Sequence, residues 1–229
     1  MAFSVQGGSL FEALDPKEQG IFDAEFQNLV DSFLVERDFA SVFLRGRSFL
    51  NNLAGRAKAE LSEVFNGVLA QTGFGWGLIQ PDQVGRTTTN VTNPTGATSG
   101  LISPNSWRRA PIATGFNDWL GSAATKNQIN RDVGFIGIIG IGDYAPVPTA
   151  VATRFSIEGI THPVWDYQWA VRNGLRVWGL PEPQGIGSRS SFNLRLKDIN
   201  TGGDETFLFG AIFARSQYLG KETPALDSP

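Results

Sequence analysis

The residues with the most obvious chemical potential lie in one stretch, THPVWDYQWAVRNGLRVWGLPEP, residues 161–183. It contains the only histidine of the chain, His162, together with Asp166 and three of the six tryptophans. An imidazole beside a carboxylate could transfer protons, and exposed coplanar rings could stack on a sugar. His162 has no partner residue in a recognisable motif, however, and metal sites need more than one His or Cys ligand. We therefore expect His162 to be an ordinary loop histidine.

Acidic side chains in or beside predicted strands offer a second kind of chemistry, because a pair of carboxylates can hydrolyse a glycosidic bond. None of them lies in a distinctive motif. The segment DINTGGDE, residues 198–205, has the composition of a turn and lacks the spacing of an EF-hand calcium loop. The carboxylates on which a glycosidase-like enzyme would draw are Asp143, Glu158, Asp166, Asp198, Asp204 and Glu205.

Other motifs do not specify a reaction. In GFIGIIGIGD, Gly137, Gly140 and Gly142 are spaced G-x-x-G-x-G and are followed by DYAPVPT, so the dinucleotide-binding fingerprint is not met. SWRRAP, residues 106–111, sets one aromatic ring beside two arginines, which is weak evidence for a contact with nucleic acid or with an acidic neighbour. The chain has no cysteine, which excludes thiol catalysis and disulfides. We expect no enzyme activity, no cofactor, no metal site and no specific nucleic-acid partner.

The aromatic stretch is most simply interpreted as a β-hairpin. With a period of two, Trp165, Tyr167 and Trp169 fall on one face, and Asn173-Gly174 suits a two-residue type I′ turn. That turn places Trp169 opposite Trp178, a pair that would stabilise a packed or interfacial aromatic face. The alternative is a helix in which Trp165 and Trp169 are four residues apart and Asn173-Gly174 forms the C-cap.

The first third of the chain predicts two amphipathic helices. Asp15 is a good N-cap and Pro16 suits the first helical position, so one helix should cover residues 16–35. A second should begin near Ser41 or Ser48 and end within residues 67–73. Both keep one face apolar, which must be covered by the chain itself or by a neighbour. With Trp165, Trp169 and Trp178, the positions expected to make packing or subunit contacts are Phe22, Phe26, Phe33, Phe49, Leu53 and Phe65.

Charge separates these two helices. Residues 12–38 carry eight acids, whereas residues 45–58 carry four basic residues and no acid. This pattern is typical of two solvated helix faces, and it would also suit head-to-tail matching between copies of the chain.

From residue 132 onward the patterns are those of strands. VGFIGIIGIG is apolar on both faces, VATRFSIE and SFNLRLKD alternate, and ETFLFGAIFARSQYL is again apolar throughout. Turn clusters such as YAPVPTA, PEPQGIGSRS and NTGGDE separate them. We therefore predict an α+β fold in which N-terminal amphipathic helices precede an antiparallel, jelly-roll-like β-sandwich. The predicted regions are helices in 1–75, a loop-rich connection in 76–131, the sandwich in 132–219 and an extended tail in 220–229.

The predicted connection, residues 76–131, is rich in Gly, Thr, Asn and Pro. We expect at most one strand in it, near residues 86–91, and a short helix near residues 117–123.

This pattern resembles the single jelly-roll capsid proteins of bacterial and archaeal viruses. The resemblance rests on residues 132–219, where GIIGIG, RFSIEG, the Asn173-Gly174 hairpin and TFLFGAIFARS would be successive strands. The N-terminal helices depart from a minimal jelly roll. The resemblance implies a structural role in a virion, in which copies of the chain, with other virion proteins, tile a shell or tube.

Composition agrees with assembly, since only 18% of residues are charged and neutral surfaces pack without like-charge repulsion. The N-terminal sequence lacks a signal-peptide pattern and no long apolar run is present, so outside a virion we expect a cytoplasmic protein without a transmembrane segment. The alternative function is a carbohydrate- or receptor-binding β-sandwich module. That module would need at least two exposed, coplanar rings among Trp76, Trp107, Trp165, Trp169 and Trp178.

Overall fold

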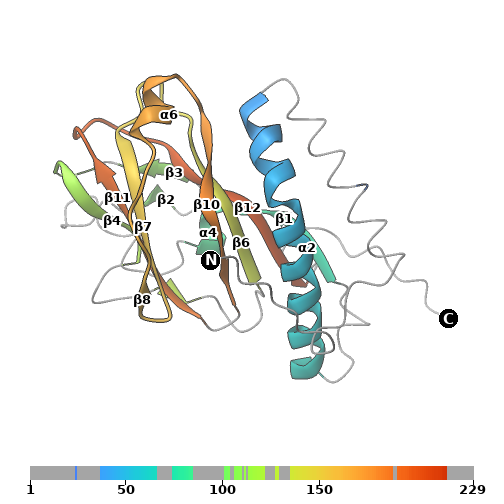
Figure 1. Ribbon diagram of the computed structural model, residues 1–229. Coiled ribbons are helices and arrows are strands. Elements are labelled where there is room, and N and C mark those ends of the chain that lie inside the picture. Colours follow the sequence, from blue (N-terminus) through green and yellow to red (C-terminus); the bar gives the residue numbers. More distant parts are fainter. Residues whose placement is uncertain are drawn as a thin grey trace.

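The computed structural model describes most of the chain from the second predicted helix to the last strand (Figure 1). The predicted first helix, with Phe22, Phe26 and Phe33, lies outside the described residues, as do the strand expected at 86–91 and the tail at 220–229. The described residues are Ala24, 37–65, 74–84, 101–103, 106–109, 111, 113–121, 127–128, 135–187 and 190–215.

One sheet has four antiparallel strands in the order β1-β12-β6-β10. Strand β6 is buried along its whole length because it has a hydrogen-bonded neighbour on each side and a covered face above and below. This confirms the central strand predicted from VGFIGIIGIG. The four strands are β1 (Phe74–Leu78), β6 (Phe135–Asp143), β10 (Val177–Ile186) and β12 (Thr206–Arg215).

A second sheet has six strands in the order β4-β11-β7-β8, with β5 also paired to β11 and β9 also paired to β7. In β11, Phe192, Leu194 and Leu196 are buried whereas Lys197 is exposed, which confirms the predicted alternation. The strands are β4 (Gly115–Leu120), β5 (Asn127–Gln128), β7 (Ala150–Ile157), β8 (Ile160–Thr161), β9 (Trp165–Asp166) and β11 (Ser191–Asp198).

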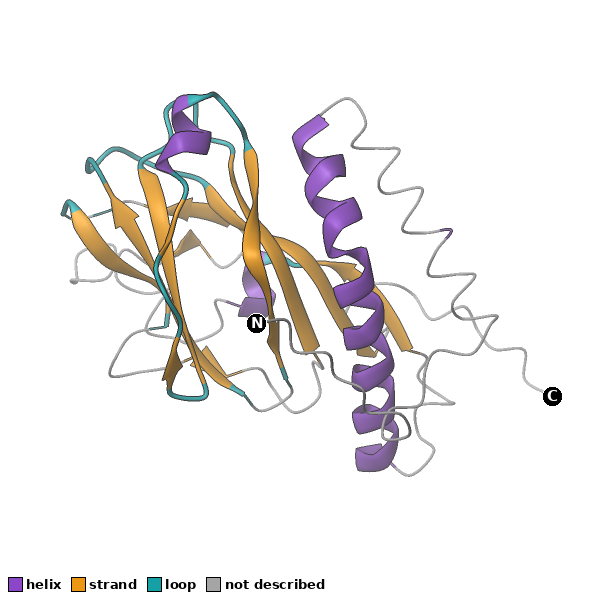
Figure 2. Ribbon diagram, in the orientation of Figure 1, coloured by secondary structure: helices purple, strands orange, loops and turns teal. Residues whose placement is uncertain are grey.

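The two sheets share one hydrophobic core. In β12, Leu208 and Ile212 belong to the cluster that also contains the inward side chains of the six-stranded sheet. The alternate residues Phe207, Phe209 and Phe213 belong to a second cluster, formed with the helix on the outer face. The result is three layers, with the four-stranded sheet between the six-stranded sheet and a helix (Figures 1 and 2). The predicted arrangement of antiparallel sheets with a helix before them is confirmed.

Helix α2 (Arg37–Phe65) covers the outer face of the four-stranded sheet. Gly46 lets it approach β6 closely, since a Cβ at this position would lie 2.6 Å from a methyl carbon of Ile139. Leu53 is buried against this sheet and Phe49 is half-buried, so both contact their own chain. Phe65 is the last residue of the helix. The helix begins earlier than predicted, and Phe39 of its first turns packs edge-on against Phe209 at 5.3 Å.

The predicted hairpin at 165–180 is wrong. After β9 the chain forms a short helix, α6 (Gln168–Arg172), before β10 begins. A type I′ turn needs positive φ at both central residues, but Asn173 has φ −90° and only Gly174, at +73°, is left-handed. The Gly174 and Leu175 amides donate to the carbonyls of Val171 and Ala170 at 3.0 and 3.1 Å, which is a Schellman C-cap. The helical alternative therefore describes this cap.

The predicted loop-rich connection contains strands of both sheets. The glycine-rich segment at β1 pairs with β12 along five residues, and the helix expected at 117–123 is replaced by β4, which pairs with β11. These strands are short and gain their stability from long-range pairing, which local composition does not report. The other elements of the connection are helix α4 (Pro81–Val84) and the paired strands β2 (Leu101–Ser103) and β3 (Ser106–Arg109).

The turn predicted over PEPQGIG is also wrong, since residues 181–186 belong to β10. Strand β10 is an edge strand, and its pairing with β6 shifts between Gly179 and Gln184. Pro181 and Pro183 lie within this irregularity, where a missing N–H breaks no ladder. None of the helices in the described part of the chain is long and apolar enough to cross a membrane.

Candidate functional site

Three connections meet at one end of the two sheets, because the antiparallel strands β6, β11 and the segment before β10 all turn back there. We call this the loop end. It consists of the β6–β7 loop (144–149), the segment containing α6 (167–176) and the β11–β12 loop (199–205). Backbone amides of Asp143, Tyr144 and Ile199 donate to the carbonyls of Arg176, Glu205 and Thr149 at 2.9, 3.1 and 3.0 Å.

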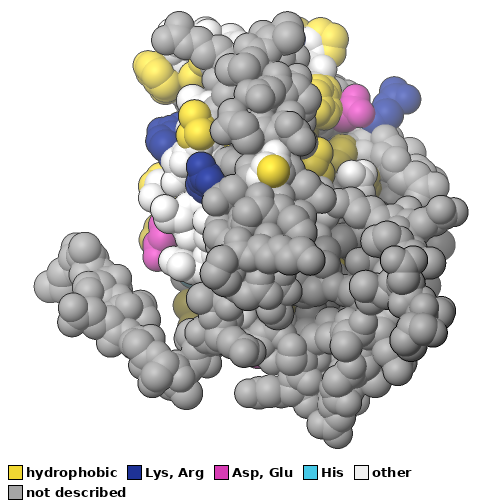
Figure 3. All heavy atoms as spheres, turned by 90° about the vertical axis from the view of Figure 1, so that its right-hand side faces the viewer, with side chains coloured by type: hydrophobic (Ala, Val, Ile, Leu, Met, Phe, Trp, Pro, Cys, Tyr) yellow, Lys and Arg dark blue, Asp and Glu magenta, His cyan; other side chains and the backbone are white. Residues whose placement is uncertain are grey.

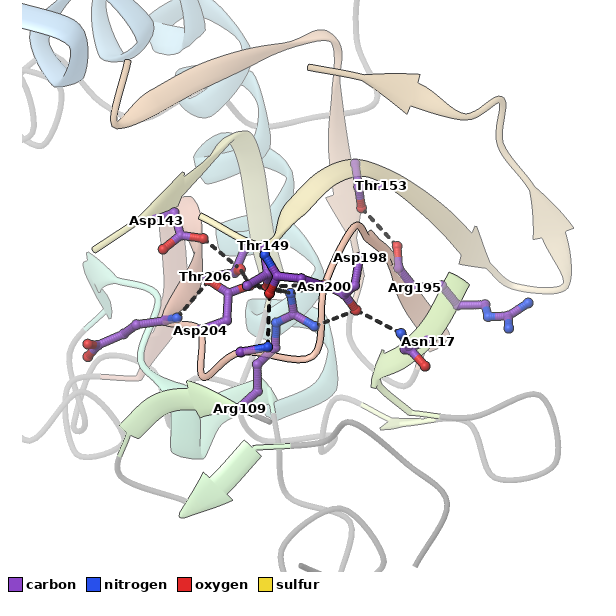
Figure 4. A network of polar contacts seen from close by, with 12 residues as sticks. Arg109, Asn117, Asp143, Thr149, Thr153, Arg195, Asp198, Asn200, Asp204 and Thr206 are labelled. Atoms are coloured by element: carbon purple, nitrogen blue, oxygen red, sulfur yellow. Dashed lines mark hydrogen bonds and ion pairs between the residues drawn. The ribbon is translucent and has the colours of Figure 1, made fainter. Parts of the chain in front are cut away.

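A fully buried arginine, Arg109, lies under the loop end. Its backbone pairs with that of Asp204 through two hydrogen bonds of 2.9 and 3.0 Å, which join β3 to the β11–β12 loop. Its guanidinium binds Asp198 with two nitrogens, Nη1 donating at 2.9 Å, and Nη2 also reaches Asp204 (Figure 4). A bidentate arginine–carboxylate contact is charge-assisted and fixes the relative orientation of its partners.

Neutral side chains complete the network from other strands. Asn117 of β4 donates from Nδ2 to Asp198 at 2.8 Å, and the hydroxyl of Thr149 donates to Asp204 at 2.6 Å. The hydroxyl of Thr206 lies 3.0 Å from Asp204 and 3.2 Å from Asp143, and so connects the two carboxyl groups. The network thereby ties β3, β4, β6, β11 and β12 to one another at the loop end (Figure 4).

The neighbouring carboxyl groups of Asp143 and Asp204 differ in protonation, the first being neutral and the second ionised. Burial, together with a hydrogen bond to Asp204, raises the pKa of Asp143 to about 8. Burial also raises the pKa of Asp204, but the hydrogen bond with Asp143, the charge of Arg109 and the threonine hydroxyls outweigh it and hold that pKa at about 2. Two adjacent buried carboxylates therefore share one proton at neutral pH.

Tyr167 extends the buried region toward α6. Burial raises the pKa of its phenol well above the ordinary value, and the charge of Arg109 offsets only part of this. Its ring stacks on that of Trp178 at a centroid distance of 4.3 Å. The aromatic core is thus continuous with the polar network.

The carboxylates considered for glycoside hydrolysis do not form an exposed pair. Asp143, Asp198 and Asp204 are brought together, but they are 0%, 2% and 4% exposed. Glu158 and Asp166 are exposed and each accepts from a backbone amide, of Ser191 at 2.6 Å and of Gln168 at 2.9 Å. Glu205 follows Asp204 and is half-buried. No group of three or more acidic or histidine side chains in the described residues is arranged to hold a metal ion.

The tryptophans are spread over different environments. Trp178 is buried, Trp165 is half-buried against Phe155, and Trp169 of α6 is 72% exposed. His162 is half-buried with its ring 6.2 Å from that of Trp165. All six tryptophans lie in the described residues, and Trp169 alone among them is exposed. The pair of exposed coplanar rings that a sugar platform requires is therefore not present.

Apolar side chains stand exposed on all three segments of the loop end. Trp169 and Val147 are the most exposed, at 72% and 71%. The space-filling view, from the side on which α2 lies, shows a few separate apolar side chains of the described residues, mostly in its upper half (Figure 3). Tyr144 and Ile199 are the other exposed apolar residues of these segments.

Part of this site is weakly indicated by residue types in the sequence. The acids of DINTGGDE and the arginines of SWRRAP stand out by type, yet Arg109 lies 95 positions from Asp204 and nothing local indicates that they meet. Asn117, Thr149 and Thr206 carry no signal, because their role depends on the strand pairing.

Comparison of the chain with models of known protein families, with curated proteins and with solved structures gives no significant match. What the chain does is therefore inferred from its own geometry.

Proposed function

We propose that this chain is a structural subunit that assembles with copies of itself, and with other virion proteins, into the shell or tube of a virion. The observation that carries the proposal is the order in which the strands pair. The fold that this order indicates is a jelly roll, which is built from eight strands in two Greek keys and occurs in viral capsids.

The strands pair as in one long hairpin, the first with the last and so on inward, and this hairpin is folded over, or wound, so that its strands form two sheets. Strands β8 and β9 both pair with the same edge of β7, so we count them together as one strand. Without the separate pair β2-β3 and the two-residue strand β5, eight strands remain, and β8 with β9 is the fifth of them. The first strand then pairs with the eighth (β1·β12), the second with the seventh (β4·β11), the third with the sixth (β6·β10) and the fourth with the fifth. Winding adds the third with the eighth (β6·β12) and the fourth with the seventh (β7·β11). These six pairings are those expected of a jelly roll, and they support the proposal.

The same fold hosts lectins and enzymes, so the choice of a shell subunit needs support from the surface. The three candidate carboxylates that lie together, Asp143, Asp198 and Asp204, are buried, and among the tryptophans that a lectin could align only Trp169 is exposed. The loop end instead presents apolar side chains from three connections, which is the character of a protein–protein contact. A structural role therefore fits the described residues better than a catalytic or sugar-binding one.

The test is the size of the purified chain in solution. Light scattering after size-exclusion chromatography, with negative-stain images of each peak, should show shells, tubes or rings whose proportion rises with protein concentration. A monomer at all concentrations from low to high salt would overturn self-assembly. Tryptophan emission that changes on addition of glycans would instead favour the binding module, through Trp169.

A further inference from the structure

The buried network at the loop end contains more acidic groups than basic ones. Asp143, Asp198 and Asp204 are almost completely buried, and the guanidinium of Arg109 binds two of them, Asp198 and Asp204. Three ionised carboxylates around one guanidinium would leave buried negative charge without compensation, which is strongly unfavourable. A proton on one of the three groups reduces this excess from two negative charges to one, and so favours the folded chain.

The hydrogen bonds show which carboxyl group holds the proton. Asp198 accepts hydrogen bonds from Nη1 and Nη2 of Arg109 and from the side-chain amide of Asn117. Asp204 accepts from Arg109 and from the hydroxyl of Thr149. Asp143 has no contact with the guanidinium in the described network, and its Oδ1 accepts the Ala145 amide at 2.7 Å. Asp143 is thus the carboxyl group least able to remain ionised beside Asp204.

We propose that Asp143 is a proton-operated latch, whose neutral carboxyl group holds the loop end together and whose ionisation in mildly alkaline solution loosens it. The acid sits at the end of β6, immediately before the β6–β7 loop, and its own amide bonds to the carbonyl of Arg176 before β10. Repulsion between Asp143 and Asp204 would therefore act directly on the loops that these residues anchor. The latch concerns the folded chain itself, whether or not the chain assembles.

Groups from every neighbouring element face Asp143. The acidic neighbours are Asp204 of the β11–β12 loop and the phenol of Tyr167 before α6, with Asp198 of β11 beyond Asp204. The cations are Arg109 of β3, which is bonded to Asp204, and Arg176 before β10, whose carbonyl accepts the Asp143 amide at 2.9 Å and whose Nη1 donates to the Ala145 carbonyl at 2.5 Å. The neutral donors are Thr149, Thr206 and the Ala145 amide. The acidic members all oppose a charge on Asp143, and Arg109 is already bonded to two of them.

The sign of the pH dependence follows from the two carboxyl groups. Asp143 has a pKa of about 8 when folded, above its ordinary 3.8, so the folded chain binds more protons than the unfolded chain between about pH 4 and 8. Its contribution to stability is full below pH 4 and is lost as pH rises through 8. Asp204, with a pKa of about 2, acts oppositely and loses its contribution only as pH falls below 4. Between pH 6 and 9 only the Asp143 effect remains.

The experiment compares the wild-type chain with Asp143→Asn, whose amide can donate to Asp204 as the protonated acid does but cannot ionise. Melting temperature is measured from pH 6 to 9.5, with the exposed Asp166→Asn as the matched control. The wild type and the control should lose several degrees over this range, and Asp143→Asn should lose much less. Parallel curves for all three proteins would overturn the latch.

A second measurement keeps the test independent of whether Asp143→Asn folds. Amide hydrogen exchange of the wild type, corrected for intrinsic rates, is followed in residues 144–149 and 199–205 and in the centre of β6. Opening of the two loops should increase by up to about tenfold per pH unit between pH 6 and 8, because opening releases one proton. Loop exchange that is unchanged with pH, or that rises no more than in β6, would also overturn the proposal.

Discussion

Two adjacent arginines differ completely in environment, and this difference makes the buried network testable. Arg109 is fully buried and bonded to Asp198 and Asp204, whereas Arg108 is exposed. Replacing Arg109 by Met leaves buried carboxylates without their cation and should cost about 3–5 kcal/mol of unfolding free energy. Arg108→Met should cost less than about 1 kcal/mol. Urea unfolding followed by tryptophan emission measures both, and similar losses would show that the network does not hold the loop end.

The composition of this site could be guessed from the sequence, but its assembly could not. Asp143, Asp198 and Asp204 lie at predicted strand ends, which is where charged groups usually remain hydrated. The burial of Asp198 and Asp204 depends on Arg109, which reaches these two carboxylates from a strand that local sequence does not predict. A contact across 89 positions, as between Arg109 and Asp198, is fixed by the order of strands and not by any neighbouring residue.

Glycine at position 210 is required by close contact between two backbones. A Cβ there would lie 1.9 Å from the carbonyl oxygen of Gly137, at the point where the pairing of β12 with β6 shifts register. Backbone cannot move aside as a flexible side chain can, so Gly210→Ala should destabilise the fold by about 3 kcal/mol or more. Gly203→Ala meets no atom within 4 Å and serves as the control, with an expected effect below about 1 kcal/mol. Equal midpoints in urea would contradict this packing.

At the scale of elements, helix α6 and the hairpin that the sequence suggests make opposite predictions for Asn173 and Gly174. In the Schellman cap only Gly174 is left-handed, so Gly174→Ala should cost about 1–2 kcal/mol. Asn173 has an ordinary φ, and its replacement by Ala removes only one exposed hydrogen bond, from its side-chain amide to the Trp169 carbonyl. Asn173→Ala should therefore cost less than about 1 kcal/mol of unfolding free energy. A type I′ turn would make both substitutions costly. Thermal unfolding of the two variants separates the two structures.

The elements that the sequence predicts correctly are those with a strong internal pattern. β6, β7 and β11 show continuous or alternating burial that matches their residue types. β1 and β4 were missed because their pairing partners are more than 70 positions away and supply most of their stability. In the aromatic stretch the residues fit both the period of a strand and the period of a helix. The chain forms a short helix there, which ends in the cap at Gly174.

At the scale of the whole molecule, the buried network supports the loops whose exposed side chains form the loop end. Charged groups beneath the loops hold three connections in fixed positions, and those connections carry Trp169, Val147 and Tyr144 outward. Preorganised loops lose little conformational entropy when a neighbour docks on them. Apolar side chains on rigid loops are therefore suited to a repeated contact between subunits.

The assembly proposal makes its sharpest prediction at opposite ends of the molecule. Trp169→Ser and Val147→Ser remove apolar contacts from the loop end, whereas Ile160→Ser removes a similarly exposed side chain, 67% accessible, from the start of β8 at the opposite end of the sheet. If the loop end joins subunits, loss of a central tryptophan costs about 2 kcal/mol per contact and raises the concentration needed for assembly by at least about tenfold. Val147→Ser should act in the same direction, and Ile160→Ser should leave assembly unchanged. Light scattering across a dilution series gives the protein concentration at which each variant assembles. If Ile160→Ser and Trp169→Ser raise this concentration equally, the loop end has no special part in joining subunits.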